Sequence, residues 1–276
     1  MKLATIRTPD GTRAVRVEGT EYVDLGSSDV GELLAHDDWQ ARAASATGTT
    51  VAGENTDFAP VVPRPGKVLC VGLNYRNHIL EMGRELPAHP TVFAKFAEAL
   101  IGANDDIALA PESDAVDWEA ELVVVLGKAV RRASEAAAAD AIAGFTVMND
   151  VTMRDWQYRS AQWLQGKTFE GTTPLGPVLV TPDELPGGLA PALTMTGSVD
   201  GEVVQKADTS DLVFGPVALV RYLSTILTLR PGDVIATGTP GGVGHARKPA
   251  RYLNAGSTLV TEIDGIGRLQ NVARPA

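Results

Sequence analysis

The sequence predicts an α+β protein that has a small N-terminal part and a larger, β-rich body. Short runs of β-branched and apolar residues recur throughout residues 61–276, whereas clear helical periodicity is rare there. Strands and helices segregated in this way favour a sandwich or roll over a doubly wound α/β fold. Residues 58–66 are rich in proline, which is typical of a linker, so we divide the chain into 1–60 and 61–276.

The N-terminal part is predicted to combine a hairpin with a helix. Apolar and polar side chains alternate on both sides of Asp10-Gly11, a dipeptide favoured in hairpin turns. A further short strand is expected at 22–25. From Asp29 to about Ala46 the sequence is rich in alanine and its pattern is helical.

The body is predicted to contain many strands and few helices. Strands are expected at 67–72, 120–126, 145–149, 176–180, 192–199, 233–237 and 258–263. Helices are expected at 134–143 and 214–228, and Asp211 could cap the second of them.

The composition narrows the choice of partners and compartments. The 34 acidic residues outnumber 24 basic ones and give a net charge of −10, which disfavours nucleic acid and anionic membranes. Cys70 is the only cysteine, so no intrachain disulfide can form, and its apolar neighbours indicate a core residue. Arg7 and Pro9 interrupt any signal-peptide core, and no apolar stretch approaches the length of a membrane span. We therefore expect a cytoplasmic protein without nucleic-acid or membrane partners.

Three acidic residues at predicted strand ends are candidates for a metal site. Glu119 and Glu121 adjoin one apolar run and point to the same face, because side chains at i and i+2 do so on a strand. Asp150 ends another apolar segment. Three carboxylates suit Mg²⁺ or Mn²⁺ better than Zn²⁺. Taken alone, however, a Glu-x-Glu pair beside a strand is more often a solvated edge.

A candidate general base lies just after the Cys70 strand. On a helix, His78 and Glu81 would share one face, where the carboxylate could orient the imidazole. An exposed surface pair would show the same spacing. Residues 84–90 contain two prolines and are expected to form a mobile loop that could close over a site.

Two further segments could bind a substrate. The polar stretch from Asp150 to Pro177 fits an amphipathic helix equally well, and its Gly-Lys-Thr at 166–168 lacks the glycine spacing and the strand of a phosphate-binding loop. The glycine-rich stretch at 238–244 would let backbone N–H groups approach a small carboxylate. It lacks the spacing and helix of a dinucleotide site, and a plain turn-rich connection remains its alternative.

Taken together, these motifs resemble the fumarylacetoacetate hydrolase family. The motifs are Gly-Leu-Asn-Tyr-x-x-His-x-x-Glu at 72–81, Glu-x-Glu at 119–121, Asn-Asp at 149–150, Arg-Asp-x-Gln at 154–157, Gly-Lys-Thr-Phe at 166–169, Pro-Leu-Gly-Pro at 174–177 and Thr-Gly-Thr-Pro at 237–240. Their order and joint presence, from 67 to about 271, make this resemblance more specific than any single motif. It implies a mixed β-sandwich roll, usually dimeric, that holds Mg²⁺ or Mn²⁺, and we expect a homodimer.

The resemblance also assigns roles to individual residues. The metal ligands would be Glu119, Glu121 and Asp150, and the catalytic residues would be His78, Glu81 and Lys167. The substrate contacts would be Tyr75, Lys95, Arg154, Gln157, Gly238 and Thr239. Two positions depart from the common pattern and could reshape the pocket: Phe96, where proline or a small residue is frequent, and Glu170, where aspartate is frequent.

The function that the resemblance implies is metal-dependent cleavage of the carbon–carbon bond of a 2,4-dioxo acid such as fumarylpyruvate. Water activated by His78 would attack the distal carbonyl, giving pyruvate and a carboxylic acid. The alternatives are oxaloacetate decarboxylation and isomerisation of 2-hydroxyhepta-2,4-diene-1,7-dioate, and a non-catalytic carboxylate-binding protein is less expected. The expected partner is a small 2-oxo carboxylate, whose distal group could pair with Arg84 and Arg247.

Overall fold

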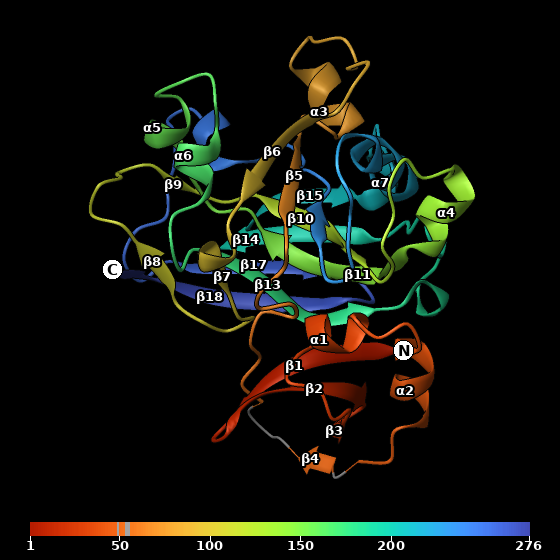
Figure 1. The fold of residues 1–276 in the computed structure, drawn as a ribbon. Coiled ribbons are helices and arrows are strands. Elements are labelled where there is room, and N and C mark those ends of the chain that lie inside the picture. The colour runs from red at the N-terminus through yellow and green to blue at the C-terminus, as the bar shows by residue number, and fades with distance from the viewer. Residues whose placement is uncertain (49, 53–55) are drawn as a thin grey trace.

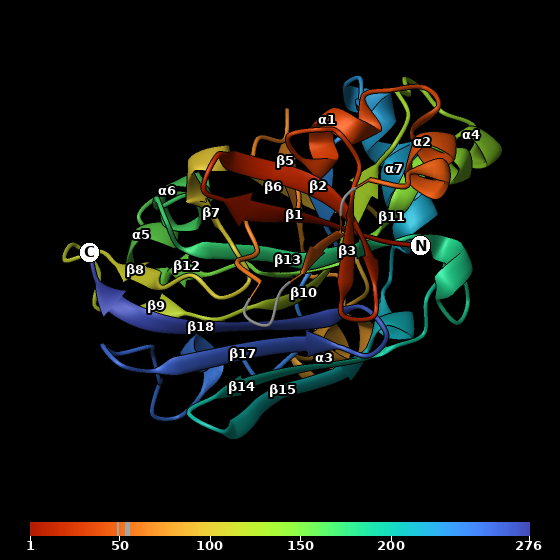
Figure 2. The same ribbon diagram turned by 90° about the horizontal axis from the view of Figure 1, so that it is seen from below.

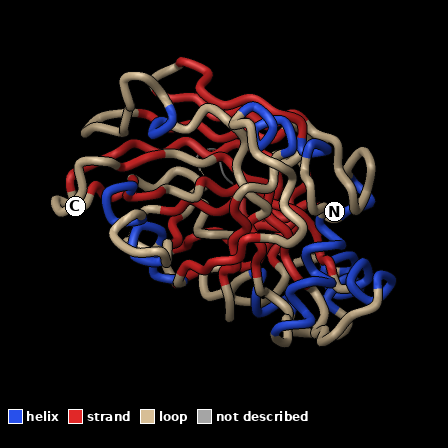
Figure 3. The backbone as a smooth tube through the Cα atoms, turned by 90° about the horizontal axis from the view of Figure 1, so that it is seen from above, coloured by secondary structure: helices blue, strands red, loops and turns tan. Residues whose placement is uncertain are grey.

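Two β-sheets make up most of the molecule, and the helices lie at its periphery (Figures 1 and 3). The structure is a computed structural model that describes residues 1–48, 50–52 and 56–276. Among these residues, one sheet has eleven strands, the second has five, and two short strands form a separate ribbon. The predicted α+β class is confirmed.

The elements run in the following order. The large sheet contains β1 (Lys2–Thr8), β2 (Gly11–Glu18), β3 (Glu21–Asp24), β4 (Thr50–Ala52), β5 (Val68–Gly72), β6 (Thr91–Lys95), β7 (Leu100–Ile101), β10 (Ala120–Leu126), β11 (Ile142–Asn149), β13 (Thr173–Val180) and β16 (Val234–Ala236). The small sheet contains β8 (Ile107–Leu109), β14 (Thr194–Val199), β15 (Glu202–Asp208), β17 (Thr258–Ile263) and β18 (Gly267–Pro275), and the ribbon pairs β9 (Val116–Asp117) with β12 (Thr152–Met153). The helices are α1 (Val30–Leu34), α2 (Trp39–Ser45), α3 (Arg76–Glu81), α4 (Glu135–Asp140), α5 (Arg154–Gln157), α6 (Leu164–Lys167) and α7 (Pro216–Ile226), with short 3-10 turns η1 (Ala97–Ala99), η2 (Pro182–Glu184), η3 (Thr209–Asp211) and η4 (Gly244–Ala246).

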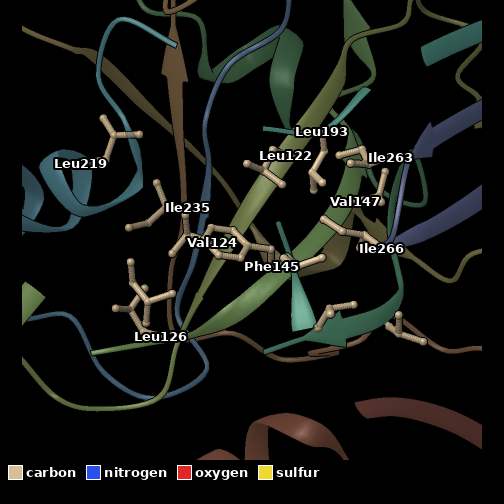
Figure 4. Close-up of a cluster of buried hydrophobic side chains, with 14 of the residues drawn as sticks. Leu122, Val124, Leu126, Phe145, Val147, Leu193, Leu219, Ile235, Ile263 and Ile266 are labelled. Atoms are coloured by element: carbon tan, nitrogen blue, oxygen red, sulfur yellow. The ribbon is translucent and has the colours of Figure 1, made fainter. Parts of the chain in front are cut away.

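Strand β10 is buried on both faces and lies between β11 and β16 in the large sheet. Leu122 and Val124 face the small sheet, where they join a cluster that includes Ile263 (Figure 4). Val123 and Val125 face the opposite way and pack in the cluster that holds the apolar residues of α1 and α2. Since burial of each such side chain stabilises the fold by about 1.5–3 kcal/mol, this run fixes the strand firmly in the core.

The N-terminal strands extend the sheet of the body. Strand β1 pairs with β2 on one side and with β13 on the other, where Lys2 lies opposite Val180 and Leu3 opposite Leu179. Figure 2 shows β1 beside β13, with the strands of the small sheet below them. The division near residue 60 stays a prediction, and the two parts on either side of it share one sheet.

Several predicted elements differ from the observed ones. The helix expected at 29–46 is two helices, because the polar residues at 36–38 end one and begin the other. The helix expected at 134–143 ends at Asp140, since Ile142 already belongs to β11. Asp211 does not cap α7, whose N-cap is Gly215; its carboxylate instead accepts the backbone N–H of Asn77, at the start of α3, at 3.0 Å. Within the described ranges no helix is long and apolar enough to span a bilayer.

Candidate active site

The three predicted metal ligands converge because β10 and β11 pair in antiparallel register. Ala120 lies opposite Asn149, so Asp150 lies beside Glu119 and donates its N–H to the Glu119 carbonyl oxygen at 2.8 Å. Glu119, Glu121 and Asp150 each offer a carboxylate oxygen, and these oxygens lie within 4.8 Å of one another. All three residues are buried. The hard oxygen donors of this triad suit a divalent cation such as Mg²⁺ or Mn²⁺.

Two buried lysines contact the triad. The Nζ of Lys95 lies 2.6 Å from Oδ1 of Asp150, and the Nζ of Lys167 lies 2.8 Å from both Asp150 and Glu119. Burial raises the pKa of Asp150, but the two ammonium groups outweigh it, so the pKa is lowered overall. Asp150 is therefore ionised at neutral pH.

Glu121 has a different environment from the other two carboxylates. Its Oε2 accepts the backbone N–H of Gly238 at 2.7 Å, but no ion pair reaches it from the residues that the structure describes. Burial, together with the charges of Asp150 and Glu119, raises the pKa of Glu121 well above its usual value. A buried carboxylate without a cationic partner is costly, so the residues present fit a bound divalent cation at the triad.

Lys167 lies in the site because α6, which it ends, packs closely on α5. Gly166 makes this possible, because a Cβ at that position would overlap the backbone nitrogen of Gln157 and the carbonyl oxygen of Met153. Burial lowers the pKa of Lys167, but Asp150 and Glu119 raise it further, and the net effect is a rise. Lys167 therefore keeps its positive charge and cannot serve as a base at neutral pH.

A cavity of about 350 Å³ opens beside the triad. The predicted site residues that line it are His78, Glu119, Arg154, Gln157, Lys167 and Thr239. They come from segments that are distant in the sequence, and α3, α5 and α6 lie on the side of the molecule away from β1–β4 (Figure 1). Phe93 and Trp163 form an apolar part of the wall, with their ring centroids 5.3 Å apart.

His78 faces this cavity from α3 and is half-buried. Burial lowers its pKa, while the charges of Glu81 and Glu119 oppose the shift without reversing it. The imidazole is thus neutral at pH 7 and able to accept a proton. The glycine-rich loop supports the ring, since a Cβ at Gly241 would lie 3.0 Å from its Nδ1.

The structure does not assemble the predicted His78–Glu81 dyad. Glu81 is exposed, and no hydrogen bond or ion pair between the two side chains occurs in the described part of the chain. Helical spacing placed both residues on α3, but the carboxylate faces solvent rather than the imidazole. Glu81 influences His78 through its charge alone.

Three predicted substrate contacts lie outside the cavity wall. Tyr75 is 1% exposed and packs in the core, where its backbone bridges to Leu212. Lys95 is held by Asp150 and by the carbonyl oxygen of Val151, so it supports the triad instead of a ligand. Gly238 donates its N–H to Glu121 and serves that carboxylate.

Two cavity residues retain donors for a ligand. The Oγ1 of Thr239 accepts a hydrogen bond from Gln205 at 2.8 Å, which leaves the hydroxyl proton of Thr239 to donate elsewhere. Likewise, the Oε1 of Gln157 accepts from Arg154 at 2.9 Å, and its amide nitrogen is available as a donor. Both groups suit a carboxylate or a carbonyl oxygen in the cavity.

Sequence reasoning missed two residues of the site, Asp117 and Gln205, and left the place of a third, His245, open. Asp117 is buried and accepts hydrogen bonds from Arg154 at 2.7 Å and from the backbone N–H of Gly244 at 2.7 Å, so it joins two walls of the cavity. Gln205 holds Thr239, but β15 is too polar to stand out as a strand. His245 is exposed and lines the cavity, so the structure fits both readings that the sequence left open for it, a position near the site and an exposed loop. Of the missed residues, only Asp117 had a visible signal in the sequence. It is a third acidic residue in the alternating pattern of Glu119 and Glu121, two positions before Glu119.

Three other residues that were expected to shape the pocket do not line it. Phe96 and Glu170, the two departures from the family pattern, are exposed and do not line the cavity. Arg247 points away from it, because its guanidinium lies 3.6 Å from Glu202 and donates to the carbonyl oxygen of Val204 at 3.2 Å. Arg84, by contrast, does line the cavity.

Residues 67–274 match the family described as fumarylacetoacetate (FAA) hydrolase C-terminal. The chain is also similar to curated proteins. It is 42% identical over 231 residues to the mitochondrial oxaloacetate tautomerase Fahd2a of Rattus norvegicus, covering 83% of this chain and 73% of that protein. It is 46% identical over 220 residues to the mitochondrial oxaloacetate tautomerase FAHD2A of Bos taurus, covering 79% and 69%.

Solved structures share the whole fold. Fumarylacetoacetate hydrolase from Exiguobacterium antarcticum is 29% identical with a TM-score of 0.89, covering 100% of both chains. A 5-carboxymethyl-2-hydroxymuconate delta-isomerase from Mycobacterium smegmatis is 31% identical with a TM-score of 0.83, again covering 100% of both. A 2-hydroxyhepta-2,4-diene-1,7-dioate isomerase from Mycobacterium marinum is 30% identical with a TM-score of 0.79, covering 100% of this chain and 98% of that one.

These relatives correct one prediction from the sequence. The expected cytoplasmic location is wrong, because the curated relatives from rat, cattle and human are all named as mitochondrial proteins. The inference rested on a single cysteine and on the first few residues of the chain, and neither feature separates one reducing compartment from another.

Proposed function

The chain belongs to the fumarylacetoacetate hydrolase family of enzymes, and on that premise we propose that it catalyses the keto–enol tautomerisation of a short 2-oxo dicarboxylate such as oxaloacetate. Relatives named oxaloacetate tautomerase and structural neighbours named isomerases support this reading. The isomerase alternative drawn from the sequence is thereby better supported than acylpyruvate hydrolysis, its main prediction.

The observation that carries the proposal is that a half-buried imidazole, His78, and an ammonium group ion-paired with Glu119 and Asp150, Lys167, line the same cavity. Enolisation removes a proton from C3 while negative charge develops on the C2 oxygen. It therefore needs a base near C3 and a positive charge near that oxygen. The lowered pKa of His78 provides the base, and the raised pKa of Lys167 provides the charge.

The proton and electron movements balance with these groups alone. The C3 proton passes to the imidazole of His78, and its electron pair forms the C2–C3 double bond. The C2 oxygen takes up the charge opposite the Lys167 ammonium. Protonation of that oxygen by the imidazolium completes the enol and returns His78 to its neutral form.

The remaining residues orient the 2-oxo carboxylate. The Thr239 hydroxyl and the Gln157 amide are donors available to its oxygens. Mg²⁺ or Mn²⁺ held by Glu119, Glu121 and Asp150 would supply Lewis-acid stabilisation of the enolate. Arg154 is ion-paired with Asp117 and Glu119, and these contacts fix its part of the cavity wall.

A hydrolase would make an additional demand on the site. Water attack on a distal carbonyl needs a base that holds the water in place, and the expected partner of His78 for that task, Glu81, does not contact it. A proton shift within one bound molecule needs only the base itself. His78 alone therefore meets the demand of tautomerisation.

The test is to mix the enol form of oxaloacetate with the purified enzyme and Mg²⁺ or Mn²⁺, and to follow loss of the enol by ultraviolet absorbance. Pyruvate is measured in the same samples, and acetylpyruvate and fumarylpyruvate are assayed in parallel. We expect rapid enol-to-keto conversion without pyruvate release. Pyruvate formed at the rate of enol loss would instead indicate a decarboxylase, and faster cleavage of an acylpyruvate would restore the hydrolase.

A further inference from the structure

We propose that His245 binds the distal carboxylate of a dicarboxylic substrate at the outer wall of the cavity. This inference rests on the proposed function, whose substrates carry a second carboxylate. The residue lies in η4, directly after the glycine-rich loop, and it lines the same cavity as His78 and Lys167. It therefore gives the cavity a second imidazole, on a different element from the first.

The backbone at His245 is fixed relative to the inner site. Its N–H donates to Oδ2 of Asp117 at 3.0 Å, and the N–H of Gly244 donates to Oδ1 of the same carboxylate at 2.7 Å. Asp117 also accepts from Nε of Arg154 at 2.7 Å. One buried carboxylate thus sets the position of the loop against the wall that carries Arg154 and Gln157.

The side chain of His245 is also held. Its Nδ1 lies 2.9 Å from the hydroxyl oxygen of Tyr252, and its ring centroid lies 5.3 Å from that of Tyr158. When Tyr252 donates to Nδ1, the proton of a neutral imidazole resides on Nε2, which becomes a donor. No hydrogen bond to Nε2 occurs among the described residues. In this tautomer the ring presents an unused N–H group at the cavity wall.

The cationic side chains near the cavity are less able to take this role. Lys167 is paired with Glu119 and Asp150, so it belongs to the inner, 2-oxo end of the site. Arg247, which the sequence suggested for the distal group, is turned toward Glu202 and is not part of the wall. Arg84 also reaches the wall, but no hydrogen bond or ion pair among the described residues holds its guanidinium. His245 is the group that hydrogen bonds from both its backbone and its ring hold in place.

The test compares substrates with and without the distal charge. His245→Phe keeps the ring between the two tyrosines but removes the donor, whereas His245→Gln keeps an N–H donor. Because a hydrogen bond to a charged group is at stake, His245→Phe should lose about ten- to hundredfold in kcat/KM with oxaloacetate, mainly through KM. The 4-methyl ester of oxaloacetate should be affected far less. His245→Gln should recover much of the loss, and His36→Phe, remote from the cavity, should match the wild type.

Equal losses with the diacid and the ester would overturn the inference, as would an unchanged KM for oxaloacetate. A binding measurement separates it from the proposed function. By titration calorimetry, 3,3-difluorooxaloacetate, which has no C3 hydrogen, should bind His245→Phe more weakly than wild type, while oxalate, which lacks a distal group, should bind both alike. If wild type fails to turn over oxaloacetate but this difference persists, the tautomerase proposal fails and the His245 site stands. If the difference is absent, the His245 site is refuted.

Discussion

Glu121 is the residue on which the metal site most depends, because it is the triad member without a cationic partner among the described residues. Glu121→Gln keeps the shape and the acceptor for Gly238 but removes the charge. We expect affinity for Mn²⁺ to fall by at least about ten- to hundredfold, the loss seen when even a partner outside the ligand shell is removed. Titration calorimetry measures this, and Glu81→Gln, at an exposed carboxylate, is the matched control.

The same substitution should not harm the metal-free fold. A carboxyl whose pKa is raised in the folded state opposes folding once the pH exceeds its unfolded value, and Gln removes that cost. Thermal unfolding in chelator at pH 7 should therefore give Glu121→Gln a Tm equal to or above that of wild type. A lower Tm together with unchanged Mn²⁺ affinity would show that Glu121 is a structural residue and not a ligand.

His78 is expected to act as a single base. His78→Asn should lower kcat for enol conversion by about 10²–10⁴-fold while Mn²⁺ and oxalate still bind. Glu81→Gln should cost far less, because Glu81 contributes only its charge. Equal losses in the two variants would restore the dyad predicted from the sequence, and loss of Mn²⁺ binding in His78→Asn would make the histidine a ligand.

The pH dependence follows from the direction of the His78 shift. The pKa lies below the usual value of 6.5, and the base must be neutral to accept a proton. The kcat/KM should therefore fall toward acid pH along a limb whose midpoint lies below 6.5. This limb should be absent from the residual activity of His78→Asn. A midpoint above 6.5 in the wild type would contradict the assignment.

Among the elements, the packing of α6 on α5 controls where Lys167 lies. Gly166→Ala places a methyl group against the backbone of Gln157 and Met153, which cannot move as a side chain can. We expect a loss of about 1–3 kcal/mol in the free energy of unfolding, together with reduced turnover. Gly215→Ser, where a side chain has open space and the N-cap of α7 is kept, is the control. Full activity and unchanged stability in Gly166→Ala would mean that α6 can shift without displacing Lys167.

The strands around the site could largely be predicted from the sequence. Continuous apolar runs such as β10 bury both faces, and that pattern is distinctive. The polar strand β15 and the short strand β6 were not predicted, because their stability comes from pairing with neighbours. Hence Glu119, Glu121 and Asp150 could be placed from strand ends, whereas Gln205 could not.

The direction of side chains on short or irregular segments was what the sequence could least predict. Helical spacing could not show that Glu81 turns to solvent while His78 enters the cavity. Nor could it show that Tyr75 packs in the core, or that the loop after Gly244 returns His245 to the wall. Each outcome depends on contacts between segments far apart in the chain.

At the scale of the whole molecule, the N-terminal strands and the body share one sheet through β1 and β13. Removing residues 1–60 would expose the edge of β13 that pairs with β1 at Leu179 and Val180, and would uncover the cluster that includes Val123 and Leu179. We expect the full chain to unfold in one cooperative transition by circular dichroism and by tryptophan fluorescence alike. A fragment of residues 61–276 that is soluble, folded and as stable as the full chain would support two independent domains instead. Light scattering on the same samples tests the predicted homodimer.

Proton exchange at C3 of oxaloacetate is the most direct test of the central claim, that a neutral His78 moves a proton on a 2-oxo dicarboxylate held at the acidic triad. In D₂O with Mg²⁺, nuclear magnetic resonance follows the loss of the C3 proton signal in the presence of wild type, His78→Asn or metal alone. We expect wild type to exchange the C3 protons far faster than metal alone, and His78→Asn to lose about 10²-fold or more of that rate. Exchange by wild type no faster than with metal alone, or equal exchange by His78→Asn, would contradict the account.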